Sequence, residues 1–241
     1  ASYTETGKGI TVKANGRTFV FSKKDGQLKD VSVNNRKISF ANGPRFIGAR
    51  RADRSLDQFY NHDDEKAKAK DRTYSEFTDA AVFTKLDVKE EGGNLILTAN
   101  YKLGNLDKAQ WTIHPDGMAT LDYTYNFSGV VDLMGICFDY PEEQVLSKRW
   151  LGAGPYRVWQ NRIHGAQYDI WENDYNDPIP GETFTYPEFK GYFGSVSWMS
   201  IRTKEGTISL TNETPDSYIG VYQPRDGRDR LLYTLPESGI S

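Results

Sequence analysis

Residues 111–127, WTIHPDGMATLDYTYNF, decide the fold class of this chain. Leu121, Tyr123 and Tyr125 alternate with polar residues, which is the period-2 pattern of a strand with one buried face. The preceding residues 114–117, HPDG, favour a tight turn, because Pro presets φ and Gly accepts a positive φ. The stretch therefore predicts a β-hairpin.

The same pattern recurs along most of the chain. Apolar alternation resumes in residues 19–33, 82–88 and 196–211. Residues 19–33 and 196–211 each predict a β-hairpin, with turns at residues 24–26 and 204–206. We expect about a dozen strands and no helix longer than two turns. Residues 41–54, ANGPRFIGARRADR, are expected to form an extended connection, and residues 62–73 a solvated charged loop. The prediction is an all-β fold, a large and mainly antiparallel β-sandwich.

Composition narrows the class further. A β-sandwich can use all 241 residues as one unit, so we expect a single domain over residues 1–241. The net charge of −3 gives no reason to expect nucleic acid or an anionic membrane as a partner. Residue 1 is Ala rather than Met, so we expect a segment of a longer protein. The compartment stays open, with a periplasmic or secreted location among the alternatives.

Cysteine and metal chemistry add little. The single cysteine, Cys137, lies in an apolar run and is expected to be a small buried side chain. Acidic residues 63–65 and 172–177 could offer oxygen ligands to Ca²⁺, but Pro178 and Pro180 break the spacing of an EF-hand. No cluster of His and Cys suits zinc. We expect no metal and no cofactor.

Residues 150–192, WLGAGPYRVWQNRIHGAQYDIWENDYNDPIPGETFTYPEFKGY, show no clean periodicity and predict a long irregular segment. Such segments in packed domains often line binding surfaces. Aromatic faces can stack on the C–H face of a pyranose, and charged or amide groups can hold its hydroxyls. The candidate carbohydrate-binding residues are Arg157, Trp159, Asn161, Arg162, Glu188 and Lys190.

Each of these assignments has a structural alternative. Trp159 and Trp171 could each belong to the core or form a stacking platform for sugar, and Arg162 could pair with Glu172 or Asp169. Two further tryptophans, Trp150 and Trp198, lie in apolar strand contexts and are expected in the core.

Two segments resemble the C-terminal β-sandwich domain of family 2 glycoside hydrolases of the β-galactosidase type. The first is FVFSKKDGQLKDVSVNN at residues 19–35 with Gly-Pro-Arg-Phe at residues 43–46. The second is LGAGPY at residues 151–156, which continues to Asn161-Arg162. In the family's second motif Glu, Tyr and Asp stand where this chain has Arg157, Trp159 and Asn161.

The resemblance implies a galactose-mutarotase-like supersandwich. In that family two Glu on a (β/α)₈ barrel hydrolyse the glycosidic bond, and such a barrel alone takes about 250 residues. The resemblance therefore implies a non-catalytic accessory domain, with a carbohydrate and the catalytic barrel as its partners.

Two other functions remain open. A mutarotase or epimerase would need an acid and a base at the anomeric carbon, for which His164 and Glu188 are the best candidates. A purely structural domain would pack on the catalytic barrel without binding sugar.

Overall fold

A computed structural model describes residues 1–51, 74–76, 80–129, 133–155, 166–174, 192–214, 217–222 and 239–240. Within this part of the chain the elements are the strands β1 to β19 and one short 3₁₀ helix, so the predicted all-β class is confirmed. The chain divides into two compact units, residues 1–50 with 76–139 and residues 51–75 with 140–241. None of the helices described is long and apolar enough to cross a membrane.

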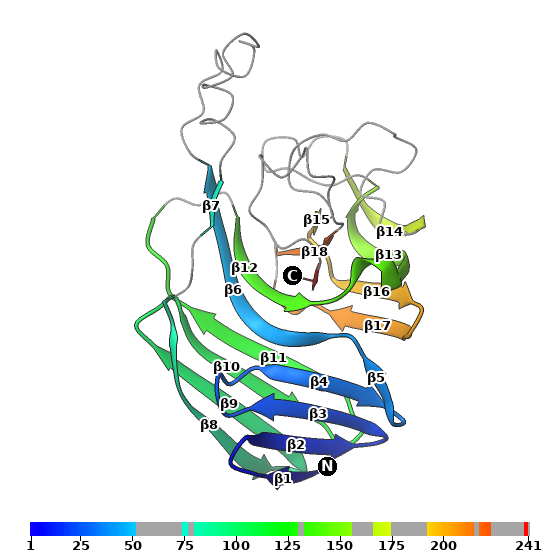
Figure 1. The fold of residues 1–241 in the computed structure, drawn as a ribbon. Helices are drawn as coiled ribbons and strands as arrows, with labels where there is room; N and C mark the ends of the chain where they lie inside the picture. Colours follow the sequence, from blue (N-terminus) through cyan, green and yellow to red (C-terminus); the bar gives the residue numbers. More distant parts are fainter. Residues whose placement is uncertain are drawn as a thin grey trace. The chain divides into compact units, whose positions relative to one another are not determined.

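The first sheet of unit 1 is antiparallel and runs in the order β1-β2-β3-β4-β6-β12, with β5 on the side of β4 (Figure 1). The turn at Asn34-Asn35 has φ of 48° and 64°, a conformation that Asn accepts more readily than most residues. It joins β4 to β5, where Val33 pairs with Arg36. The strands are β1 (Ser2–Glu5), β2 (Gly9–Ala14), β3 (Arg17–Ser22), β4 (Leu28–Val33), β5 (Arg36–Ile38), β6 (Ala41–Arg51) and β12 (Leu133–Asp139).

The second sheet of unit 1 has the order β11-β10-β9-β8. Trp111 pairs with Leu121, and the amide of Gly117 donates to the carbonyl of His114 at 2.9 Å, so the hairpin predicted for residues 111–127 is confirmed. The strands are β8 (Val82–Glu91), β9 (Asn94–Lys102), β10 (Leu106–Ile113) and β11 (Ala119–Tyr125), and the short β7 (Tyr74–Glu76) precedes them.

One end of this second sheet, β8, carries alternating charges. Lys85 Nζ lies 2.7 Å from Asp87 Oδ2, and Lys89 Nζ lies 3.0 Å from Glu91 Oε2. All four side chains are more than half exposed. The end strand therefore presents charge to solvent.

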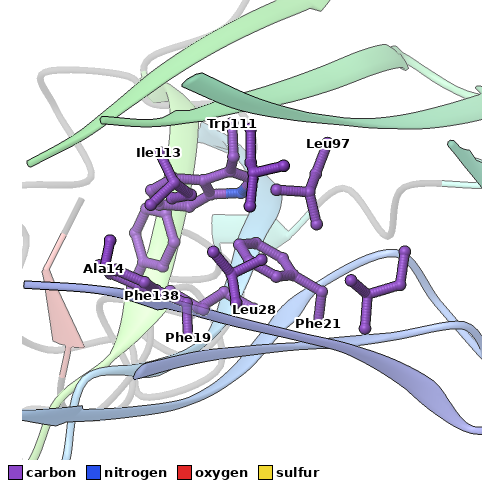
Figure 2. Packing of buried hydrophobic residues seen from close by; sticks show 11 residues of the cluster. Ala14, Phe19, Phe21, Leu28, Leu97, Trp111, Ile113 and Phe138 are labelled. Atoms are coloured by element: carbon purple, nitrogen blue, oxygen red, sulfur yellow. The ribbon is translucent and has the colours of Figure 1, made fainter. Parts of the chain in front are cut away.

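The two sheets of unit 1 face each other across one hydrophobic core (Figure 2). Trp111 of β10 contacts Phe21 and Phe138, each with ring centroids 5.9 Å away and an edge-to-face orientation. Such pairs contribute beyond the area they bury. The cluster takes side chains from both sheets: Ile10, Val12, Ala14, Phe19, Phe21, Leu28, Leu95, Leu97, Trp111, Ile113 and Phe138. The antiparallel β-sandwich is confirmed in this unit.

Turns at one end of the sandwich are joined by hydrogen bonds. Asn15 Nδ2 and Arg17 Nη1 of the β2–β3 hairpin each donate to the carbonyl of Asp116 at 2.8 Å. A Cβ on Gly117 would lie 2.6 Å from Arg17 Nη1, and Gly117 also has φ of +84°. The β10–β11 turn is thus fixed against the facing sheet.

The extended connection predicted for residues 41–54 is wrong over residues 41–51, which form the strand β6. Phe46 and Ile47 are buried, and Arg45 pairs with Cys137 of β12. Pro44, which cannot donate to a ladder, lies where the register of β6 and β12 shifts. The Gly-Pro pair thus marks an irregularity within a strand.

Unit 2 contains the sheet β14-β13-β16-β17 and a second group in which β18 pairs with β15 and β19. Trp150 of β13 packs against Phe193 of β15 with ring centroids 4.2 Å apart. Trp150, Phe193, Met199 and Ile201 have no exposed surface, so this unit has its own core. Its elements are η1 (Glu142–Gln144), β13 (Val145–Gly154), β14 (Gln167–Asp174), β15 (Tyr192–Gly194), β16 (Trp198–Thr203), β17 (Gly206–Thr211), β18 (Tyr218–Tyr222) and β19 (Gly239–Ile240).

The irregular segment predicted for residues 150–192 is also wrong in part. Residues 150–154 belong to β13 and residues 167–174 form β14, and the two strands pair antiparallel from Ser147–Asp174 to Gly154–Gln167. The sequence pattern did not predict β14, because its apolar residues Tyr168 and Ile170 lie on the exposed side of the sheet. The β16–β17 hairpin predicted around residues 204–206 is confirmed.

Truncating Phe21 tests the core of unit 1. Phe21 is fully buried, so Phe21→Ala should lower the free energy of unfolding by about 3–5 kcal/mol. Urea unfolding followed by circular dichroism measures it, with Met118→Ala, at a 64% exposed position, as the control. Equal effects of the two variants would contradict the packing described.

Candidate functional site

The six predicted carbohydrate-binding residues all lie outside the described residues. They fall in residues 156–165, between β13 and β14, and in residues 175–191, between β14 and β15: Arg157, Trp159, Asn161, Arg162, Glu188 and Lys190. The same holds for His62, His164 and the acidic residues 63–65. That these six side chains converge on one surface stays a prediction.

Within residues 150–192 the structure describes the end of β13, which precedes residues 156–165, and β14, which follows them. Successive residues of β13 face opposite sides of the sheet, and their paired neighbours on β14 and β16 face the same side. Lys148 and Trp150 pair with Asn173 and Trp171 on the inner side. Arg149 and Leu151 pair with Glu172 and Ile170 on the outer side.

Trp171 is held within the β13–β14 hairpin. Its indole Nε1 lies 3.2 Å from the carbonyl oxygens of both Gly152 and Gln167. Its ring covers Gly154, where a Cβ would come within 2.5 Å of the indole Cδ1. Of the two alternatives left open for Trp171, these contacts favour the structural one.

The two tryptophans expected in the core differ. Trp150 is fully buried, which confirms that prediction. Trp198 is only half buried and pairs with Leu151 on the outer side of the sheet, so the prediction is wrong for this residue. Its strand pattern did not show which side faced solvent.

Placing a methyl group at Gly154 tests the seat of Trp171. Gly154→Ala should displace the indole, lower the free energy of unfolding by about 1–3 kcal/mol and shift the tryptophan emission. Thermal unfolding and fluorescence measure both effects. Gly7→Ala is the matched control, because a Cβ there meets nothing within 4 Å. An unchanged emission spectrum in Gly154→Ala would contradict the described packing.

Lys148 is a feature that sequence reasoning missed. It is fully buried, and its ammonium lies 5.4 Å from the centroid of the Phe193 ring, in cation–π geometry. The neighbouring Asn173 is 4% exposed. A lysine in a strand ordinarily indicates a solvent-facing position, so the sequence gave no signal for this burial.

Tyr140, the first residue of the second stretch of unit 2, is a second buried polar group in this unit. Its hydroxyl donates to Glu205 Oε2 at 3.0 Å. Burial, with Glu205 nearby, raises the pKa of Tyr140 to about 12. The phenol therefore stays protonated at neutral pH and acts as a hydrogen-bond donor.

Unit 1 has a compact polar cluster beside the core. Arg45 Nη2 donates to Asp139 Oδ1 and Asn42 Nδ2 to Asp139 Oδ2, both at 2.6 Å. Burial alone would raise the pKa of Asp139, but the hydrogen bonds from Arg45 and Asn42 outweigh it and hold that pKa below its usual range. The cluster joins β6 to the end of β12.

Replacing Asp139 tests this cluster through pH. A lowered pKa in the folded state means that the carboxylate stabilises the fold above pH ~4 and that this stability is lost as pH falls through the folded pKa. Asp139→Asn should lower the free energy of unfolding at pH 7 by about 1 kcal/mol. The effect is this small because the Arg45 and Asp139 side chains are both partly exposed. The difference in free energy of unfolding between Asp139→Asn and the unmodified protein should become smaller below pH ~4.

Urea unfolding at pH 3 to 7 measures this, with the exposed Asp122→Asn as the control. A cost that stays constant across that range would contradict the assigned role of the Asp139 carboxylate.

In the described ranges the histidine and cysteine side chains are His114 and Cys137. His114 lies in the β10–β11 turn, as predicted, and its Nε2 is 3.0 Å from Thr120 Oγ1. Cys137 is fully buried, which confirms the expected small buried side chain. Among the residues described, no group of three or more His, Cys, Asp or Glu could hold a metal ion.

Among the described residues of unit 2, the outer side of the β14-β13-β16 sheet carries exposed apolar side chains. Tyr168 is 58% exposed and Ile170 is 47% exposed, both on β14. Leu151 and Trp198 continue the row across β13 and β16, and the exposed Arg149 and Glu172 lie opposite each other next to it. We call these six residues the outer face.

The strands of the described residues form antiparallel sheets and define an all-β fold. The family model described as "Beta galactosidase small chain" matches residues 13–223, which is most of the chain. This chain belongs to the β-galactosidase small-chain family and is therefore a domain associated with glycoside hydrolases. The resemblance to β-galactosidase-type domains is confirmed. A search of curated proteins found no match.

Proposed function

We propose that this chain is a non-catalytic carbohydrate-binding accessory domain of a family 2, β-galactosidase-type glycoside hydrolase. The family match over residues 13–223 carries the proposal. The all-β architecture supports it, because a (β/α)₈ barrel needs about 250 residues in which strands alternate with helices. In the described residues the one helical element is the three-residue η1.

The proposed ligand is a galactoside or another oligosaccharide. Arg162 would donate paired hydrogen bonds to ring hydroxyls, and Trp159 would stack on the C–H face of one sugar unit. Arg157, Asn161, Glu188 and Lys190 would complete the polar contacts. The proposed protein partner is the catalytic barrel, and the whole chain would act as one galactose-mutarotase-like domain of a longer enzyme.

A titration of the chain with lactose, galactobiose and β-1,4-galactotetraose tests this function. At least one should bind saturably, and Arg162→Ala or Glu188→Ala should weaken binding by about tenfold, the loss of one charge-assisted hydrogen bond. Isothermal titration calorimetry measures the affinity, and Lys89→Ala, far along the sequence on β8, is the control.

Two results would count against the proposal. Absence of binding to all three sugars would leave only a structural role. Acceleration of anomer exchange in a free sugar, followed by polarimetry and abolished in His164→Ala, would indicate a mutarotase instead.

A further inference from the structure

β14 has an unusual distribution of side chains. Tyr168 and Ile170 lie on its exposed outer side, whereas on its other side Trp171 is half buried, Asn173 is buried, and Gln167 and Asp169 are exposed. A strand of a stable sandwich ordinarily turns its apolar residues toward the core. The inner side of the same sheet already has its own core at Trp150, Met199 and Ile201, so packing within this sheet does not explain why Tyr168 and Ile170 face outward.

Tyr168 is also fixed in one orientation. It pairs with Ala153 on β13, and its hydroxyl lies 2.6 Å from Ser197 Oγ, at the residue before β16. β16 lies on the side of β13 opposite to β14, so the phenol crosses β13 above the small side chain of Ala153. A side chain that reaches past a neighbouring strand must lie along the sheet rather than stand upright on it.

The ring of Tyr168 therefore rests on the sheet and still leaves 58% of the residue exposed. An aromatic ring held flat, with one side toward solvent, is the geometry that stacks on the C–H face of a pyranose. The bond to Ser197 has already restricted the rotation of the side chain, so less conformational entropy is lost when a ligand binds.

The neighbouring residues extend this surface along β14. Ile170 is the next outward-facing residue, and Glu172 follows it opposite Arg149. The four steps along the strand from Tyr168 to Glu172 span about 13 Å, which suits an oligosaccharide better than a single sugar. The carboxylate of Glu172 can accept hydrogen bonds from sugar hydroxyls, and the guanidinium of Arg149 can donate them.

We propose that the outer face, with Tyr168 as its stacking platform, is a second contact surface for a neutral oligosaccharide of pyranose units. It consists of residues other than the six predicted between the strands. This inference rests on the proposed carbohydrate-binding function, and it places sugar contact on regular sheet. The sugar stacks on the ring of Tyr168 and packs against Ile170, and its hydroxyls form hydrogen bonds with Arg149 and Glu172.

Replacing Tyr168 tests the platform. Isothermal titration with β-1,4-galactotetraose should show about tenfold weaker binding for Tyr168→Ala, the worth of one aromatic stacking contact. Tyr218→Ala is the matched control, because Tyr218 is 43% exposed on β18 and should leave the affinity within about twofold. Circular dichroism verifies that both variants are folded.

Loosening the ring provides an independent readout. Ser197→Ala keeps the aromatic ring but removes its anchor, so binding should weaken by about two- to fivefold, less than in Tyr168→Ala. If the unmodified chain binds galactotetraose and Tyr168→Ala binds it equally well, the platform is wrong and the proposed function stands. If the unmodified chain does not bind, the proposed function fails and the platform fails with it.

Discussion

The packing of Trp111 between two antiparallel sheets is the interaction on which unit 1 depends. Its indole contacts Phe21 of β3 and Phe138 of β12, both in the facing sheet. A single side chain thus joins three strands that are distant in the sequence. Strand pairing cannot bind the sheets to each other, because backbone hydrogen bonds run within a sheet. Burial of apolar side chains between the sheets therefore holds the sandwich closed, and polar contacts such as those of Arg17 and Asn15 to Asp116 fix its end.

Period-2 patterns predicted the elements whose apolar side chains point inward. The hairpin of residues 111–127 and the β16–β17 hairpin fall into this group. Their turns were also predictable, because each contains a Gly with a positive φ. The patterns failed at β6, where Gly43-Pro44 resembles a break, and at β14, where Tyr168 and Ile170 face away from the core. The two failures differ in cause. At β6 a Gly-Pro pair lies inside a strand, and at β14 the apolar side chains are exposed, which a pattern of one-sided burial does not describe.

The sequence points to residues 150–192 as the region of the candidate site, and that assignment stays a prediction. Aromatic and charged residues concentrate in residues 150–192, and the family match agrees with a domain of glycoside hydrolases. The seat of Trp171 over Gly154 and the flat placement of Tyr168 depend on which residue lies opposite on β13. A single sequence does not contain this register, because it arises from pairing between strands that are joined through residues 155–166.

The charged strand at the end of the second sheet has a consequence for how this domain meets others of its kind. Lys85, Asp87, Lys89 and Glu91 would have to lose water for another chain to add a strand beside β8. That desolvation discourages the edge-to-edge growth by which β-rich proteins form fibres. In the described part of the chain, the end strand of this sheet thus carries a feature that disfavours strand addition.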